Sequence, residues 1–375
     1  MKDKIRILQL GHKRVPSREG GIEIVVGELS TRMARLGHEI TCYNRKRKHV
    51  NGRVQNNEKM QSYQGVHLKN IPTLDFKGLA AVSSSIFGGI GAALGKYDVV
   101  HFHAEGTALL CWLPRLFGKR VIVTIHGLDW QRAKWGKFAS FYIKCGERCA
   151  AKFAHEIVVL NRANQKYFYE TYGRKTIYIP NGVNRPKTLS ANLISEKYGL
   201  QKDDYILYLG RLVPEKGIRY LIEAYRRLDT NKRLVIAGGS SDTEEFVCQM
   251  KALAGGDKRI LFTGFVRGKE LGELYSNAYF YVLPSDVEGM PLSLLEAMSY
   301  GNCCLVSDIP GCAEVVENKA VLFQHGNMED LEKKLSWLCN QESVVRKYRR
   351  EAANYICYKY NWDEIVEKTI ALYQK

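Results

Sequence analysis

Short apolar runs alternate with longer amphipathic stretches along nearly the whole chain. The runs have the length of buried strands, whereas in the stretches apolar residues recur every three or four positions, as on one face of a helix. The stretch over residues 21–36 has such a face, made of Ile22, Val25, Val26, Leu29, Met33 and Leu36. Gly37 follows it and predicts the helix end. Alternation of strand and helix is typical of parallel sheets that helices cover on both faces, so we predict an α/β protein.

The predicted elements fall into two sets. The first set has strands near 5–10, 38–43, 66–71, 97–102, 120–125, 155–160 and 175–179, with helices near 21–36, 79–94, 136–153 and 162–171. The second has strands near 205–209, 233–237, 259–262, 279–283, 303–306 and 320–323, and its last helices lie near 343–358 and 362–373. Between the sets, the segment from Asn181-Gly182 to Ser195 is polar and contains Pro186, which predicts a linker. A chain of 375 residues is long enough for two domains. We place them at residues 1–182 and 183–360.

The most informative stretch is PSDVEGMPLSLLEAMSYG, residues 284–301. It follows the strand predicted over 279–283, Pro291 suits the first position of a helix, and Gly301 suits the helix end. Glu288 therefore precedes the helix, and Glu296 lies one turn inside it. The pair is either two solvated glutamates at an ordinary helix start or part of a site.

The helix start and a second loop favour a site. We expect the backbone NH groups of Gly289, Met290 and Leu292 to be free for an anion at the positive end of the helix dipole. The loop after the strand over 205–209 carries Arg211 and Lys216, which can neutralise a diphosphate, although alone each would be read as a surface charge. Two carboxylates for hydroxyl groups beside cations for phosphates suit a sugar nucleotide.

Six motifs occur in an order that resembles the retaining glycosyltransferases of family four, which have the GT-B fold. They are REGGIEIVVGELSTRMARLGHEIT, TIHGLDW, IPNGV, GRLVPEKG, TGFV and EGMPLSLLEAMSYG, and they span nearly the whole chain. The resemblance implies two Rossmann-like domains that face a central cleft: an acceptor-binding domain over 1–182 and a donor-binding domain over 183–360. It also implies that a C-terminal helix over 361–375 packs back on the first domain.

The resemblance assigns roles to residues of this sequence. It implies that Arg211 and Lys216 bind the donor diphosphate, that Glu296 binds the ribose hydroxyls and that Glu288 binds the transferred sugar. His126 would donate a hydrogen bond to that sugar from the opposite domain. Further donor contacts are expected from Gly21, Gly210, Gly238, Val266, Gly289, Met290, Pro291 and Leu292. The acceptor candidates are Glu23 and Asp129.

The residues alone leave the first-domain candidates open. His126 can also be read as a buried core histidine, although its place in a loop after a predicted strand favours a site. Glu23 can be read as a first-turn acid that the helix dipole stabilises, and Asp129 as a loop cap. The motifs nevertheless follow predicted strands, and the carboxyl ends of parallel strands are where open α/β sheets bind ligands.

The resemblance also implies an activity: transfer of a hexose with retention from a UDP-, GDP- or dTDP-sugar to a glycan or polyprenyl-diphosphate-linked acceptor. Such enzymes build capsule, exopolysaccharide, O-antigen or lipopolysaccharide. We assign no nucleophile, because front-side attack is the usual proposal for this family. We expect no metal or cofactor, since no Asp-x-Asp pair occurs and the ten cysteines form no Cys-x-x-Cys pair. The alternatives are a sugar-nucleotide epimerase or hydrolase of the same fold and a nonenzymatic basic binding protein. A nicotinamide enzyme is disfavoured because no Gly-x-Gly-x-x-Gly turn follows the first strand.

The net charge of +17 favours an acidic partner. No nucleic-acid-binding signature is visible, so we expect an anionic membrane or a phosphorylated acceptor. Cations gather at residues 45–48 and over 131–152, where Trp135, Phe138, Phe141 and Tyr142 interleave with Arg132, Lys134, Lys137, Lys144 and Arg148. This helix either rests on anionic lipid or buries its aromatic face. No signal sequence or apolar span is apparent, so we expect a cytoplasmic protein, peripheral on the inner face of the plasma membrane.

Overall fold

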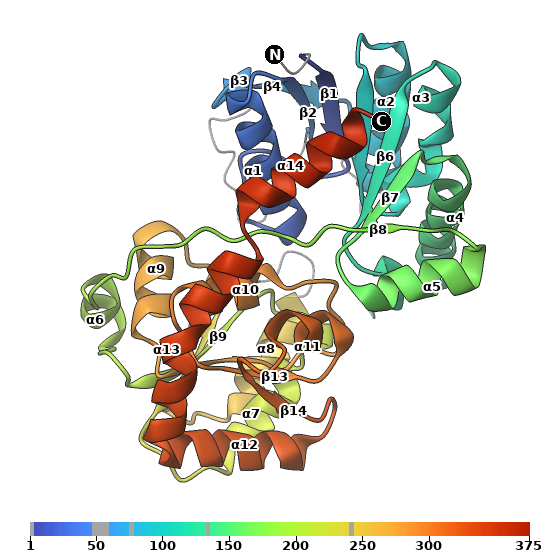
Figure 1. Ribbon diagram of the computed structural model, residues 1–375. Helices are drawn as coiled ribbons and strands as arrows, with labels where there is room; N and C mark the ends of the chain where they lie inside the picture. Colours follow the sequence, from blue (N-terminus) through green and yellow to red (C-terminus); the bar gives the residue numbers. More distant parts are fainter. Residues whose placement is uncertain (1–3, 47–59, 75–78, 133–135, 240–243) are drawn as a thin grey trace. The chain divides into compact units, whose positions relative to one another are not determined.

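The computed structural model describes residues 4–46, 60–74, 79–132, 136–239 and 244–375. The chain forms two compact units. Unit 1 comprises Met1–Asn181 and Trp362–Lys375, and unit 2 comprises Gly182–Asn361. Each unit is a mainly parallel sheet with helices on both faces, as Figure 1 shows, so the predicted pair of Rossmann-like domains is confirmed.

Unit 1 contains a sheet with the strand order β3-β4-β2-β1-β5-β6-β7-β8. Its strands are β1 (Arg6–Leu10), β2 (Glu39–Arg45), β3 (Ser62–Tyr63), β4 (Val66–Ile71), β5 (Val99–His103), β6 (Arg120–Ile125), β7 (Glu156–Val159) and β8 (Ile177–Tyr178). All pairs are parallel except β3 with β4. The central strands are buried on both faces because helices cover them, which explains their continuous apolar runs.

The helices of unit 1 are α1 (Gly21–Arg35), α2 (Leu79–Leu94), α3 (Trp112–Leu116), α4 (Lys137–Phe153), α5 (Arg162–Tyr172) and α14 (Trp362–Tyr373), with short 3-10 turns η2 (Gly106–Leu110) and η3 (Asp129–Gln131). Helix α14 lies beside α1, where Arg32 Nη1 is 2.5 Å from Asp363 Oδ1. The carbonyl of Leu372 also accepts a hydrogen bond from Arg120 Nε at 2.6 Å. Ile365, Val366 and Ile370 of α14 are buried, so this helix is part of the first unit's core.

Unit 2 contains a fully parallel sheet with the order β11-β10-β9-β12-β13-β14. Its strands are β9 (Tyr205–Leu209), β10 (Arg233–Ala237), β11 (Ile260–Gly264), β12 (Phe280–Leu283), β13 (Cys304–Ser307) and β14 (Val321–Phe323). Its helices are α6 (Leu193–Tyr198), α7 (Ile218–Arg226), α8 (Glu244–Ala254), α9 (Gly268–Asn277), α10 (Leu292–Ser299), α11 (Pro310–Val316), α12 (Met328–Asn340) and α13 (Glu342–Lys359), with the 3-10 turn η4 (Pro214–Lys216).

One predicted boundary was wrong. Pro291 is not the first helical residue but the N-cap of α10, with extended backbone angles of φ −75° and ψ 115°. Its carbonyl accepts hydrogen bonds from the NH groups of Leu294 and Leu295. The helix therefore starts at Leu292, and its first turn is tied to the proline carbonyl.

Within the described residues, no helix is both long and apolar enough to cross a membrane.

Candidate functional site

The loop after β12, residues 284–291, is held from three sides in unit 2. The Tyr220 hydroxyl hydrogen-bonds to the Pro284 carbonyl and lies 2.8 Å from Asp286 Oδ1. The NH of Asp286 donates to the Glu215 carbonyl at 2.9 Å, and the Ser307 hydroxyl donates to the Ser285 carbonyl at 2.6 Å. Helix α7, turn η4 and strand β13 thus fix the backbone that carries Glu288.

Two glycines allow this loop to pack closely. A Cβ on Gly217 would lie 1.9 Å from the Pro284 carbonyl oxygen, and a Cβ on Gly311 would lie 2.2 Å from that of Glu288. Gly217 also has φ +65°, a conformation that other residues rarely adopt. Both positions require glycine because backbone atoms of the loop occupy the space of a side chain.

Lys216 and Glu288 form an ion pair at this loop. Their side chains are only 12% and 10% exposed, and the Ser285 hydroxyl donates to the same carboxylate oxygen, Oε1, at 2.8 Å. A buried charge needs such partners, since an isolated one would lose its hydration without compensation. The structure therefore brings together two residues that the sequence assigned to different parts of the donor.

Arg211 lies beside this pair. The Tyr208 hydroxyl donates to the Arg211 carbonyl at 3.0 Å. Burial raises the pKa of Tyr208 well above its ordinary value, and the nearby charge of Glu288 raises it further, while that of Arg211 opposes the rise. Arg211, Lys216 and Glu288 thus gather around the carboxyl ends of β9 and β12.

Glu215 belongs to the same cluster and was not predicted. Its side chain is 6% exposed, and neither carboxylate oxygen has a hydrogen-bond partner in the described part of the chain. In the sequence, a glutamate beside a lysine in a loop is typical of a surface charge. Only its burial distinguishes it.

The predicted glycines and Val266 lie on neighbouring loops. The NH of Gly210 donates to the Ala237 carbonyl at 3.0 Å, and the NH of Gly238 donates to the Gly264 carbonyl at 2.8 Å. A Cβ on Gly238, whose φ is +144°, would lie 1.8 Å from the Gly210 oxygen. Val266, after β11, is buried. The loops after β9, β10 and β11 are therefore packed into one edge of the sheet.

Glu296 lies inside α10, as predicted, and is half-buried. Its Oε2 accepts a hydrogen bond from Tyr275 at 3.3 Å. At the start of the same helix, Gly289 and Met290 are buried and take part in contacts of their own. The expectation that their NH groups bind an anion stays a prediction.

Three predicted residues of unit 1 gather at the carboxyl ends of β1 and β6. Burial lowers the pKa of His126 to about 4, and the negative charges of Asp129 and Glu23 oppose this lowering, which places both carboxylates near the ring. Glu23 Oε1 accepts from the Lys13 NH at 2.8 Å, and Asp129 pairs with Arg132 at 2.8 Å. Gly21, by contrast, is the exposed first residue of α1.

The loop that carries Asp129 rests on two buried acids. Glu105 Oε2 accepts from the Asp129 NH at 2.8 Å. Burial raises the pKa of Glu105 well above its ordinary value, and the charge of Asp129 raises it further. Glu147 accepts from Trp130, Tyr167 and Tyr172 at 3.2, 2.8 and 2.5 Å.

Three buried histidines were also missed. His12 follows β1, and His101 and His103 lie on β5; all are at most 1% exposed. A signal was present, because two polar residues at alternating positions in the run VVHFH predict a polar face on a buried strand.

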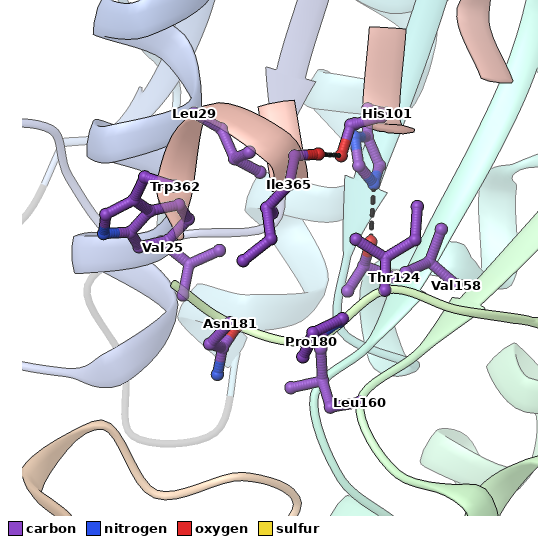
Figure 2. Close-up of a pocket in the computed structure, with 12 residues that line it drawn as sticks. Val25, Leu29, His101, Thr124, Val158, Leu160, Pro180, Asn181, Trp362 and Ile365 are labelled. Carbon is purple, nitrogen blue, oxygen red and sulfur yellow. Dashed lines mark hydrogen bonds between the residues drawn. The ribbon is translucent and has the colours of Figure 1, made fainter. Parts of the chain in front are cut away.

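Figure 2 shows a pocket of unit 1 bounded by α1, the sheet and α14. Its walls are mostly apolar and include Val25, Leu29, Trp362 and Ile365. His101 reaches it, with its ring hydrogen-bonded to Thr124. The predicted site residues are not among those that line it.

Comparisons with known proteins agree with this architecture. Residues 19–185 match the profile of Glycosyltransferase Family 4, and residues 191–372 match that of Glycosyl transferases group 1. The chain is 25% identical to N,N'-diacetylbacillosaminyl-diphospho-undecaprenol alpha-1,3-N-acetylgalactosaminyltransferase of Campylobacter jejuni, over 97% of this chain and 93% of that protein.

Two solved structures show the fold. Sucrose-phosphate synthase from Thermosynechococcus elongatus matches with a TM-score of 0.85 and 19% identity, over 99% of this chain and 98% of the other. HepE of Anabaena, solved with UDP-glucose, matches with a TM-score of 0.80 and 15% identity, over 98% and 99%. The two profile matches show that the chain belongs to the glycosyltransferases of family four, and the solved structures show that it has the GT-B fold.

Proposed function

We propose that this glycosyltransferase moves a sugar, with retention, from a UDP-sugar to a polyprenyl-diphosphate-linked acceptor in the synthesis of a cell-surface polysaccharide. The observation that carries the donor assignment is the buried Lys216–Glu288 pair beside Arg211, on a loop fixed from three sides. The acceptor class is supported by the name of the Campylobacter jejuni relative, and UDP by the ligand of HepE.

In the proposed donor site, the cations bind the diphosphate and the carboxylates bind hydroxyl groups. Arg211 and Lys216 stabilise the negative charge that develops on the leaving diphosphate, a role that contributes about 3 kcal/mol per donor group in comparable sites. Glu296 accepts hydrogen bonds from ribose hydroxyls, and Glu288, already held by Ser285, accepts them from the transferred sugar. The small residues Gly210 and Gly238 let the nucleotide approach the backbone.

We propose front-side attack with no enzyme nucleophile. The enzyme contributes by placing the acceptor hydroxyl beside the anomeric carbon, and the departing phosphate receives the acceptor proton. No metal is required in this proposal, because two cations supply the charge that a divalent ion would. Glu23 and Asp129 are assigned to the acceptor side.

The test is transfer of radiolabelled sugar from UDP-sugars to a short polyprenyl-diphosphate glycolipid in excess EDTA. Arg211→Ala and Lys216→Ala should each lower kcat by about two orders of magnitude while circular dichroism and the melting temperature show an intact fold. Lys197→Ala is the control, because Lys197 pairs with Glu270 on the exposed surface. Near-wild-type turnover in either site variant would contradict the donor assignment, and activity restored only by magnesium or manganese would contradict metal independence.

We further propose that unit 1 binds the inner face of the plasma membrane through a lipid-facing surface on α2, α3 and α4. This surface consists of the exposed side chains Ile86, Phe87, Ile90, Leu94, Leu116, Phe117, Phe138 and Phe141. Phe138 and Phe141 are 85% and 63% exposed, so the alternative of a buried aromatic face on α4 is wrong for these two rings. The half-buried Tyr142 joins α4 to α2 through Ser85.

Charge complements the apolar side chains of this surface. Lys137, Arg148 and Lys152 on α4 are exposed, whereas the acid of that helix, Glu147, is fully buried. The sequences of α2 and α3 contain no acid. Aromatic rings with cations and without exposed carboxylates suit an anionic bilayer. Lys134, Trp135, Arg47 and Lys48, which the sequence analysis added to this surface, lie outside the described residues.

A further inference from the structure

A continuous chain of hydrogen bonds joins the C-terminal helix to His126. Tyr373 on α14 has its hydroxyl 2.6 Å from His101 Nδ1 and 3.3 Å from Gln9 Nε2. The other end of the Gln9 amide, Oε1, is 2.7 Å from His103 Nε2, and His103 Nδ1 is 3.0 Å from His126 Nε2. Gln9, His101, His103 and Tyr373 are all at most 4% exposed. The chain is therefore shielded from water except at its His126 end.

The side-chain amide of Gln9 determines which group donates in each of these hydrogen bonds. The Gln9 oxygen can only accept, so His103 carries its proton on Nε2 and donates it to Gln9. His103 Nδ1 is then an acceptor, which requires that His126 donates from Nε2.

The other branch is consistent with the same order. The Gln9 NH₂ group donates to the Tyr373 oxygen, and the Tyr373 hydroxyl proton is directed to His101 Nδ1. His101 then donates from Nε2 to Thr124 Oγ1 at 2.7 Å, a bond visible in Figure 2. Each group in the chain thus has one assigned direction.

This order determines what His126 presents to a substrate. With the proton on Nε2 and directed to His103, Nδ1 is an acceptor, and within the described residues it has no hydrogen-bond partner. His126 is partly exposed, near Glu23 and Asp129. The sequence-based expectation that His126 donates a hydrogen bond is the opposite arrangement.

We propose that Gln9, His103 and Tyr373 are positioning residues that hold His126 as the Nε2-protonated tautomer, so that its Nδ1 accepts a hydrogen bond from a hydroxyl group of the sugar substrates. The catalytic part of this inference rests on the proposed function. Burial keeps the ring neutral, because the pKa of His126 is lowered to about 4 and that of His101 to about 3. A neutral ring has a defined acceptor nitrogen, whereas a charged one donates from both.

The tautomer can be measured without any substrate. In protein labelled with ¹⁵N and ¹³C at histidine, the ring shifts of His126, assigned with the variant His126→Asn, should show Nε2–H at pH 7.5. Nδ1–H on His126 would mean that the Gln9 amide is reversed, and it would overturn the proposal, as would a mixture of tautomers. This measurement determines the positions of the protons even if the protein transfers no sugar.

Substitutions at the residues of this hydrogen-bond series then test its effect on turnover. Gln9→Met removes the acceptor, and Tyr373→Phe removes one hydroxyl, so both should give mixed His126 tautomers and a kcat about tenfold lower, with KM for the donor little changed. Gln9→Glu keeps an acceptor toward His103 and should retain both the tautomer and most of kcat. Thr369→Val is the control on α14, since among the described residues Thr369 hydrogen-bonds only to the Ile365 carbonyl of its own helix. Unchanged tautomer and turnover in Gln9→Met would overturn the positioning role.

Discussion

A carboxylate that loses water without gaining a partner destabilises a folded protein, and Glu215 is in this position. Both of its oxygens lie inside unit 2 without hydrogen bonds from the described residues. The neighbouring Lys216 is paired with Glu288 instead. The buried carboxylate of Glu215 thus lowers the stability of the fold next to the proposed donor site, as is common where a site must bind a charged ligand.

We therefore predict that Glu215→Gln makes the ligand-free protein more stable, by about 1 kcal/mol, because the amide is nearly the same size and carries no charge to desolvate. Chemical unfolding monitored by circular dichroism measures the change. Glu244→Gln, at an exposed position, is the control for the altered net charge and should change stability little. A clear loss of stability in Glu215→Gln would mean that the carboxylate makes an interaction essential to the fold.

The positions of the site residues could be predicted better than their partners. Arg211, Glu288 and His126 were expected near strand ends because apolar runs mark strands, and parallel strands end at one edge of a sheet. The Lys216–Glu288 pair could not be predicted, since the two residues are 72 positions apart and the contact depends on how α7 meets the loop after β12. Glu215 and His103 were missed for the same reason: burial is a property of the packed sheet.

At the scale of elements, the loop after β12 is positioned by the helices around it. Helix α11 approaches so closely that Gly311 contacts the backbone at Glu288 and Gly289. The sequence predicted α10 and the strand before it, but not this contact. It likewise missed β3, a two-residue strand paired with β4 across Gln64 and Gly65, which both have positive φ. Such short elements depend on a neighbouring strand more than on their own pattern.

We predict that Gly311→Ala displaces the loop that carries Glu288. Its Cβ would lie 2.2 Å from the Glu288 oxygen, so backbone must move, at a cost of about 1–3 kcal/mol. Affinity for a UDP-sugar, measured by calorimetry, should fall at least tenfold. Gly27→Ala in α1 is the control because nothing lies within 4 Å of its Cβ, and it should stabilise the helix slightly. Unchanged affinity in Gly311→Ala would show that donor binding does not need this loop position.

The lipid-facing surface makes a second prediction at this scale. Phe138→Ser combined with Phe141→Ser should reduce cosedimentation with phosphatidylglycerol vesicles at least tenfold, because burial of a phenylalanine contributes about 1.5–3 kcal/mol. Lys137→Gln with Lys152→Gln should weaken binding most at low salt, because both side chains are exposed.

The matched control for the lipid experiment is Tyr358→Ser in α13 of unit 2, where the ring is 85% exposed, as Phe138 is. This variant should sediment with vesicles as the unmodified protein does. Equal binding of the Phe138/Phe141 variant and the unmodified protein would exclude α4 as the membrane contact, and equal binding to neutral phosphatidylcholine would exclude the charge contribution.

For the molecule as a whole, the buried histidines among the described residues lie in unit 1. Unit 1 has the histidines His12, His101 and His103 inside it, with Glu105 as a buried acid. Burial lowers the pKa of His12 to about 4 and that of His101 to about 3, and it lowers that of His103 well below its ordinary value. The fold of each unit was predictable from repeated strand–helix patterns, whereas this acid sensitivity follows only from the packed interior.

We predict that unit 1 loses stability as the pH falls below about 6.5. Above that pH the histidines are neutral in both states. Below that pH the histidines of the unfolded chain become protonated, whereas the buried rings of the folded protein stay neutral. The free energy of unfolding therefore falls by about 1 kcal/mol per histidine between pH 6.5 and 5.5. Glu105 acts in the opposite direction, because its raised pKa lets the folded state bind a proton before the unfolded state does. His126, whose pKa burial also lowers to about 4, is a fourth such ring, so four histidines against one carboxyl leave a net loss on the order of 3 kcal/mol. Guanidinium unfolding followed by tryptophan fluorescence reports on this unit, since four of the five tryptophans belong to it.

Two variants test the contribution of single histidines. His12→Asn should make the pH dependence about one third less steep, whereas His67→Gln, at an exposed position, should leave it unchanged. A free energy of unfolding that stays constant from pH 7.5 to 5.5 would show that these rings are not held neutral by burial.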